Sequence, residues 1–239
     1  MHIHRPRPLH GAREILIEIA VIVVGIVIAL AGEQAVEALH WRHEAEVGEA
    51  ALKAAYTREV NNAALREAQN ECVEQRLASL SSILRRASES GRLPPITAIG
   101  HPPSKPWTIG AWDVLVANQT VSHLPRGKMF AYIRIAQTTA FLSALGDREE
   151  QQWATLDSMV GPGRRLSDVE AEQLRTALAE ASDSNRHMRV SGGSLRDAVK
   201  ATGLVDPSDF ADAVRRAAID KHNAAICRPM AAPSMAAPS

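Results

Sequence analysis

The chain has 239 residues, a formal net charge of zero and only 4% aromatic residues. Without a basic balance it lacks the electrostatic signature of a nucleic-acid-binding protein, so we expect no nucleic-acid partner. Abundant alanine and few aromatic residues favour closely packed helices over a β-sandwich. The composition therefore predicts an all-α fold.

One long apolar run, residues 15–32 (ILIEIAVIVVGIVIALAG), dominates the N-terminal part of the chain. As a helix it would be about 27 Å long, close to the roughly 30 Å hydrocarbon core of a bilayer. Two interpretations fit: a retained transmembrane helix, or a secretory signal peptide with a small-x-small cleavage site at 29–31. The length of the run, Glu18 within it and the uninterrupted amphipathic sequence after it favour the retained anchor.

The flanking cations predict the orientation. Arg5, Arg7 and Arg13 precede the run, whereas only Arg42 lies within about fifteen residues of its far end. We expect residues 1–14 to form a cytoplasmic tail at a bacterial inner membrane. The helical domain that follows is then periplasmic under either interpretation. It carries a net charge of about −1, because three of the 27 basic and two of the 27 acidic residues lie in or before the run.

Small and polar residues share one face of the predicted membrane helix. At about 100° per residue, Glu18, Gly25, Ala29 and Gly32 fall within about 60° of one another. Such a face suits the close approach of another transmembrane helix, so the expected partner is a second membrane protein or another copy of the chain. Alternatively, Glu18 reaches the cytoplasmic headgroups and the glycines have no partner.

Helix signals fill most of the chain beyond the membrane run. Residues 33–90 contain no proline and should continue the membrane helix as a stalk that ends at Gly91. Five prolines between 91 and 108 predict an extended crossover. Residues 109–228 should be helical, with helices over 109–118, 125–159, 168–190, 195–201 and 206–223. The domain at 33–228 is thus expected to be a helical bundle on a stalk.

Apolar spacing predicts which residues are buried in these helices. The expected core positions are Val60, Val73, Leu77, Leu80 and Leu84 in the stalk helix, Met129, Ile133, Ala136, Ala140, Phe141 and Leu145 in the third helix, Leu174, Ala177, Leu178, Ala181 and Met188 in the fourth, and Phe210, Val214, Ala217 and Ala218 in the last.

Local signals predict where the later helices begin and end. Ser167 and Glu170 form a capping-box pattern, so a helix should start at Asp168. The sequence SGGS over 191–194 should break that helix. The duplicated MAAPS sequence at the C-terminus predicts a disordered tail over 229–239.

The two cysteines, Cys72 and Cys227, both follow the apolar run. An even number in an oxidising compartment predicts one disulfide, and the alternative is two buried thiols. Closing so long a loop would stabilise the fold by roughly 5 kcal/mol in the chain-entropy model. The disulfide would connect the end of the chain to the stalk helix.

The sequence offers little catalytic chemistry. Neighbouring turns of one predicted helix carry Glu37, His40, His43 and Glu44. Polar side chains that simply face solvent explain this cluster better than a metal site does, so we expect no metal and no cofactor. Ser122 and His123 are adjacent and therefore diverge, and no G-x-S-x-G elbow is present. Glu149 and Glu150 are interpreted as an exposed helical face. Trp107 and Trp112, with His123, are candidates for a groove or interface, or else anchor the crossover on the helices.

Residues 13–34 (REILIEIAVIVVGIVIALAGEQ), with the Trp41 region after them, resemble the N-terminus of uncharacterised bacterial single-pass membrane proteins. The SKPW…AW…TVSHLP stretch over 104–125 is similar to an alphaproteobacterial group of these proteins. The resemblance covers about a quarter of the chain and implies the same single-span topology. These families carry no assigned activity that can be transferred.

Two functions fit these patterns. The first is a non-catalytic single-pass protein whose periplasmic domain binds or scaffolds a partner membrane protein or complex. The second is a periplasmic ligand-binding or sensor module that acts through a partner, because the short cytoplasmic tail leaves no room for an output domain. A cavity beside Trp107 and Trp112 would favour the second function, and a solid core would exclude it.

Overall fold

The computed structural model describes residues 11–230, apart from the side chains of Ala12 and Glu14. Within this part of the chain the fold is helical, as predicted, and its only sheet has two short strands. The elements are α1 (Ala12–Ser90), β1 (Arg92–Leu93), α2 (Gly110–Ala117), η1 (Thr120–His123), α3 (Arg126–Leu156), η2 (Asp157–Met159), β2 (Arg164–Arg165), α4 (Asp168–Thr202), α5 (Pro207–Asn223) and η3 (Ala225–Cys227).

The chain divides into two compact units, Met1–Val47 and Gly48–Ser239, and α1 contributes residues to both. In the first unit, every side chain from Ile15 to His40 is exposed, including the whole apolar run. Among the described helices, only α1 is long and apolar enough to cross a membrane, by length and composition. The predicted tail 1–14 lies mostly outside the described residues, and α1 already begins at Ala12.

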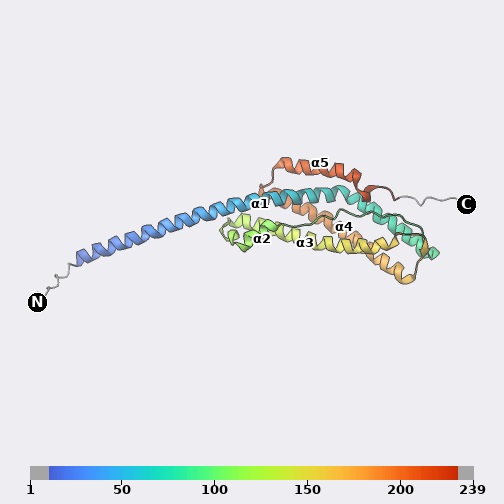
Figure 1. Ribbon diagram of the computed structural model, residues 1–239, viewed down its shortest axis with the longest axis horizontal. Helices are drawn as coiled ribbons and strands as arrows, with labels where there is room; N and C mark the ends of the chain where they lie inside the picture. The colour runs from blue at the N-terminus through green and yellow to red at the C-terminus, as the bar shows by residue number, and fades with distance from the viewer. Residues whose placement is uncertain (1–10, 231–239) are drawn as a thin grey trace. The chain divides into compact units, whose positions relative to one another are not determined.

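The core of the second unit is built mainly by α1, α3 and α4. Val60, Val73, Leu77, Leu80 and Leu84 of α1 are buried, as their spacing predicts. Leu174, Ala177, Leu178, Ala181 and Met188 of α4 are buried as well. Figure 1 shows α3 (yellow) and α4 (orange) side by side, and the core also takes in Trp153 and Leu156 of α3.

Two helix boundaries follow their local signals. Gly91 adopts φ +70°, a left-handed conformation that suits glycine, and α1 ends at the residue before it. Ser167 caps α4 by accepting a hydrogen bond from the Glu170 backbone N–H (3.2 Å). The Glu170 carboxylate does not complete the capping box, because it binds the Arg164 guanidinium instead.

The proline-rich crossover begins as a strand and then loses regular structure. Arg92 pairs with Arg165 and Leu93 with Arg164, in antiparallel register. One isolated bridge follows, between Ile96 and Gly161. From 97 to 109 the chain has neither helix nor strand, as the prolines predict, and α2 then starts at Gly110.

The predicted buried face of α3 is wrong by about one residue. Phe141 and Ala140 are exposed, and Met129, Ile133 and Ala136 are only partly buried. The buried residues of this helix are Tyr132, Ile135, Thr139, Leu142, Leu145, Glu149, Trp153 and Leu156. The buried face includes a threonine and a glutamate. A prediction from apolar residues alone therefore points to a neighbouring face of the helix.

The predicted break at 191–194 is also wrong, because α4 continues through it to Thr202. Gly192 is buried, and a Cβ at this position would lie 3.9 Å from the Cβ of Ala63. Leu195, Ala198 and Val199 then continue the buried face of the helix. Close packing on α1 therefore outweighs the low helix propensity of two glycines, which is about 1 kcal/mol each.

Helix α5 starts at Pro207, as predicted, and lies along the second part of α1 (red in Figure 1). Arg216 contacts Asn61 (2.7 Å) and Lys221 contacts Glu71 (3.6 Å). Its buried residues are Ala213 and Ala217, whereas Val214 and Ala218, predicted to face inward, are exposed and Phe210 is half-buried. Of the predicted tail 229–239, Met230 packs against the core and 231–239 lie outside the described residues.

Candidate functional site

A cavity of about 280 Å³ lies between the crossover and three helices of the second unit. Residues 101–107 of the crossover form one wall. Asn62 and Arg66 come from α1, Met188 comes from α4, and α3 supplies the largest share. The α3 residues that line it are Ser143, Gly146, Asp147, Glu149, Glu150 and Trp153.

A buried ion pair lies in the wall of this cavity. Nη2 of Arg66 donates to Oε1 of Glu149 (2.5 Å) and to Oδ1 of Asn185 (2.7 Å). All three side chains are buried. One guanidinium therefore links α1, α3 and α4 through charge-assisted hydrogen bonds.

Burial acts against both charges of the pair. It raises the pKa of Glu149 and lowers the pKa of Arg66, while their mutual attraction opposes each shift. Removing two charges from water is costly, so a buried ion pair adds little net stability to the fold.

Several donors in the wall have no hydrogen-bond partner among residues 11–230. Nε and Nη1 of Arg66 are buried in this state, and so is Nε1 of Trp153. A buried donor without an acceptor costs about 1–3 kcal/mol. Both residues line the cavity, but these three nitrogen atoms have no accessible surface of their own.

The charges at the cavity mouth are mixed. Asp147 and Glu150 line it together with Lys105, and Oγ of Ser104 donates to Glu150. Nε2 of His101 contacts Oδ2 of Asp157 (2.9 Å). The mouth therefore carries no excess of positive charge.

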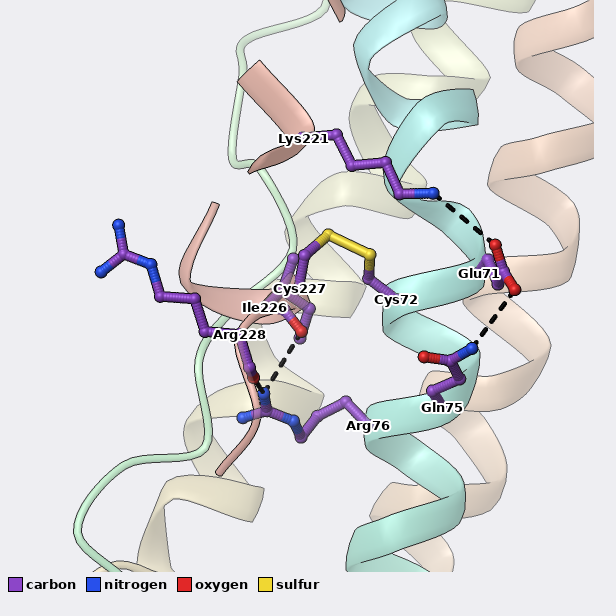
Figure 2. The surroundings of a disulfide bond; sticks show 8 residues. All are labelled: Glu71, Cys72, Gln75, Arg76, Lys221, Ile226, Cys227 and Arg228. Atoms are coloured by element: carbon purple, nitrogen blue, oxygen red, sulfur yellow. Dashed lines mark hydrogen bonds and ion pairs between the residues drawn. A yellow bond between two sulfur atoms is a disulfide. The ribbon is translucent and has the colours of Figure 1, made fainter. Parts of the chain in front are cut away.

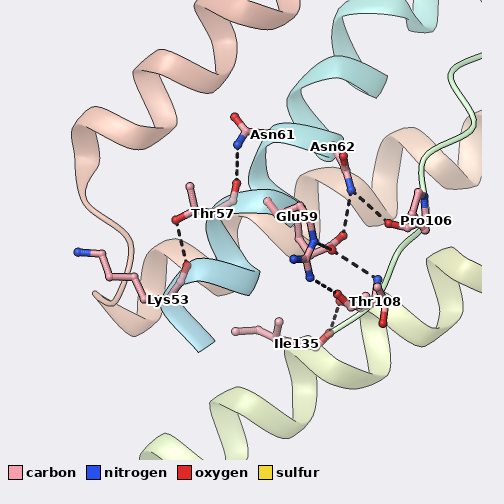
Figure 3. A network of polar contacts seen from close by, with 10 residues as sticks. Lys53, Thr57, Glu59, Asn61, Asn62, Pro106, Thr108 and Ile135 are labelled. Atoms are coloured by element: carbon pink, nitrogen blue, oxygen red, sulfur yellow. Dashed lines mark hydrogen bonds and ion pairs between the residues drawn. The ribbon is translucent and has the colours of Figure 1, made fainter. Parts of the chain in front are cut away.

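The C-terminal end of the crossover is attached to α1 by a polar network around Glu59 (Figure 3). The Glu59 side chain is fully buried and accepts hydrogen bonds from Asn62 and from the Thr108 backbone N–H, both at 3.4 Å. Asn62 also donates to the Pro106 carbonyl (3.3 Å), and Arg58 donates to the Thr108 carbonyl (2.9 Å). These contacts hold the crossover at one end of the cavity wall.

The middle of the crossover is held near a disulfide (Figure 2). Cys72 of α1 and Cys227 of η3 are joined in the structure, with an S–S distance of 2.07 Å. One turn along, the buried Arg76 donates to the carbonyl oxygens of Ile99, Ile226 (3.3 Å) and Arg228. Burial lowers the pKa of Arg76. The crossover and the C-terminal segment therefore meet on one turn of α1.

The predicted groove residues do not form one site. Trp107 is buried and lines the cavity. Trp107 and Trp112 also share a shallow groove of about 380 Å³ against α3, whereas His123 is exposed on η1 and lines neither hollow. Trp107 thus belongs to the crossover itself, and Trp112 lies on α2 directly after it.

The other predicted positions lie in the first unit. Glu18, Gly25, Ala29 and Gly32 are exposed on α1, and a Cβ on either glycine would meet no atom within 4 Å. Within residues 11–230, no group of three or more His, Cys, Asp or Glu side chains could hold a metal ion. Near His40, Trp41 donates to Glu37 (3.3 Å), and its ring is tilted by 57° from the His40 imidazole, with 5.1 Å between the ring centroids.

The interpretation of Glu149 as exposed is wrong, although Glu150 is exposed as expected. The sequence does contain a signal for the burial of Glu149. This residue follows Leu145 and precedes Trp153 at four-residue intervals, in register with the buried face. Arg66 likewise lies three residues after buried Ala63. A charged residue at a core position of a helix predicts a buried partner, but the spacing does not say which one.

Comparison with known proteins finds no family model, no curated protein and no solved structure that matches this chain. The resemblance over 13–34 and 104–125 therefore stays a prediction.

Proposed function

We propose that this chain is a non-catalytic single-pass inner-membrane protein whose periplasmic helical domain binds or scaffolds a partner membrane protein. In this proposal residues 15–32 cross the bilayer, α1 continues as a stalk, and the remaining helices form a bundle outside. The N-terminus is cytoplasmic. The partner is another transmembrane protein or a second copy of the chain.

One observation carries this proposal: the most apolar stretch of the chain has every side chain exposed. Large apolar side chains such as Leu16, Val21 and Ile28 are each about two-thirds exposed. A continuous apolar surface of this kind is unfavourable in water and favourable in hydrocarbon. The cations before the run and the cysteine pair after it support the orientation.

The docking face provides the sharpest test of the partner. A photo-crosslinking amino acid at Ile22, beside the predicted face, should give one discrete adduct in native membranes. The same group at Val27, on the opposite side of the helix, should give none. Gly25→Leu should abolish the Ile22 adduct because close approach needs a small residue, whereas the control Val27→Leu should preserve it.

The scaffold proposal fails if the protein purified in mild detergent is strictly monomeric, without a partner, and Ile22 gives no adduct. Equal adducts from Ile22 and Val27 would leave the chain in the membrane but exclude this docking face.

A second function, ligand binding or sensing through a partner, is favoured by the cavity beside Trp107. Its volume is near the lower limit of the roughly 300–1,000 Å³ typical of small-molecule sites. Its lining includes the polar side chains of Asn62, Lys105 and Ser143, which could orient a ligand.

A further inference from the structure

We propose that one surface of the second unit, formed by α2 and the start of α3, binds the headgroups of an anionic phospholipid bilayer. This basic-apolar surface consists of Val114, Val116, Arg126, Phe130 and Arg134. The inference rests on the first proposed function, because the bilayer is the one that residues 15–32 would cross. It adds a second contact with that bilayer, made by the exported domain.

The sequence of this region carries positive charge and no negative charge. Residues 114–146 contain no aspartate or glutamate, although the whole chain of 239 residues has 27 of them. The same stretch contains Arg126, Lys128 and Arg134. Glu49 of α1 neutralises Lys128 (2.7 Å), whereas neither arginine has an ion pair in the described part of the chain. Two positive charges are therefore left to attract an anionic partner.

On α3, the two arginines flank an aromatic residue. Arg126, Phe130 and Arg134 follow one another at four-residue intervals, so they lie on one face of the helix. All three are exposed, and Phe130 is 63% exposed. An aromatic side chain between cations is typical of a helix that lies in the interfacial layer of a membrane.

Helix α2 extends the apolar part of this surface. Val114 and Val116 are 61% and 48% exposed. Figure 1 shows α2 beside α3, and Trp112 of α2 lines a shallow groove together with Ala136 of α3. The acidic residue of α2, Asp113, lies in its first turn. Exposed valines on one helix thus adjoin an exposed phenylalanine on the next, and burial in the interfacial layer would be favourable for all three.

The place of this surface in the chain limits its distance from the bilayer. Helix α2 packs on the first residue of the second unit, since a Cβ at Gly48 would lie 2.9 Å from Cδ2 of Leu115. Tyr132 of α3 donates to Glu49 (2.9 Å). Only residues 33–47 separate Gly48 from the predicted membrane run, about 22 Å as a helix, and headgroups fill part of that length. The chain itself therefore holds this surface at a high effective concentration of lipid.

The three phenylalanines of the chain give a direct readout of contact with the bilayer. The full chain is labelled with 4-fluorophenylalanine and placed in nanodiscs that contain a lipid with a nitroxide on its headgroup. The nitroxide broadens the fluorine signals of residues that lie close to the headgroups. Replacing each phenylalanine in turn by tyrosine assigns its signal.

Phe210 on α5 is the internal control for distance along the chain. Its helix also starts near the beginning of the second unit, because Asp206 contacts Lys53 of α1 (2.6 Å). In nanodiscs that contain phosphatidylglycerol, we expect the Phe130 signal to be broadened about fivefold more than the Phe210 signal. Phe141, which lies eleven residues further along α3, should be intermediate.

Charge variants test the basis of the contact. Arg126→Gln combined with Arg134→Gln should abolish the difference between Phe130 and Phe210, and so should nanodiscs of phosphatidylcholine alone. Arg85→Gln combined with Arg86→Gln is the matched control, because it removes the same charge from exposed positions of α1. This control should retain the difference.

Equal broadening of Phe130 and Phe210 would overturn the lipid-binding surface and leave the membrane span intact. A difference that persists without both arginines, or without anionic lipid, would overturn it as well, because attachment to the span alone would then explain the proximity. A chain that does not co-elute with the nanodiscs would overturn the proposed span itself.

Discussion

Two stretches of α1 have opposite surroundings. From Ile15 to His40 every side chain is exposed, although residues 15–32 of this stretch are the most apolar part of the helix. After Gly48, apolar side chains recur on one face and are buried, while polar ones such as Gln75 and Ser79 stay exposed on the other. A one-sided pattern suits a helix that packs on one side against protein, whereas an apolar surface on all sides suits a helix that is surrounded by protein or by a membrane. The predictions that follow test this difference.

The largest expected effect comes from placing charge in the apolar stretch. Val23→Arg combined with Val27→Arg puts two charges near its centre, at about 2.5–3.5 kcal/mol each for insertion into a bilayer. We expect the variant chain to be lost from the membrane pellet after alkaline washing. Gln75→Arg with Ser79→Arg has the same spacing on the exposed face of the second stretch, and this control should stay in the membrane. If both variants partition alike, the two stretches do not differ as described.

The next effect concerns the buried ion pair in the second unit. Arg66→Met leaves the Glu149 carboxylate buried without its partner, which should lower the free energy of unfolding by about 3–5 kcal/mol. Arg66→Met combined with Glu149→Leu removes both charges and should recover most of the loss. Urea unfolding followed by circular dichroism measures both. If the double variant is as unstable as the single one, the ion pair itself stabilises the fold, and the loss is not due to an unpaired buried charge.

A smaller effect distinguishes the apolar side chains of the two stretches. Leu80 is fully buried, so Leu80→Ala should cost about 2–5 kcal/mol of unfolding free energy. Val24 is more than half exposed, and Val24→Ala should leave the same unfolding transition unchanged in detergent. Equal losses would mean that protein also packs around the first stretch.

The smallest effect is a pH dependence in the second stretch. Burial raises the pKa of Glu59, against weaker opposing effects from Thr108, Asn62 and Arg58. Above the usual pKa of 4.5 and up to the raised value, the folded state holds the proton more tightly than the unfolded state. The free energy of unfolding should therefore fall as the pH rises through this window.

Glu59→Gln removes this contribution. Its melting temperature relative to the wild type should rise as the pH is raised from 4 to 8, because only the wild type loses stability in this window. Glu89→Gln, an exposed position on the same helix, is the control. A constant difference between Glu59→Gln and the wild type across this range would contradict the assignment.

Local signals in the sequence predicted the local features of this fold. Gly91, Ser167 and Pro207 mark helix boundaries because each acts on its own backbone neighbours. The core positions of α1 were also predictable, since leucine and valine recur there at helical spacing. These features need no knowledge of distant residues.

The features that prediction missed depend on contacts across the chain. Glu149 is buried because Arg66, 83 residues earlier, binds it, and Asn185 lies 119 residues from that arginine. Helix α4 continues through Gly192 because that residue packs closely on Ala63. The cavity arises where the crossover spans these helices, and no spacing within one segment indicates it.

The thiol state of the chain in washed membranes tests the central proposal, a bilayer-spanning run with an exported domain, most directly. Cells of the native host are quenched in acid, and the alkaline-washed membrane pellet is denatured and treated with a polyethylene-glycol maleimide before and after reduction. We predict that the chain is in the pellet and that Cys72 and Cys227 are labelled only after reduction. Recovery in the supernatant, or labelling of both cysteines without reduction, would contradict the proposal.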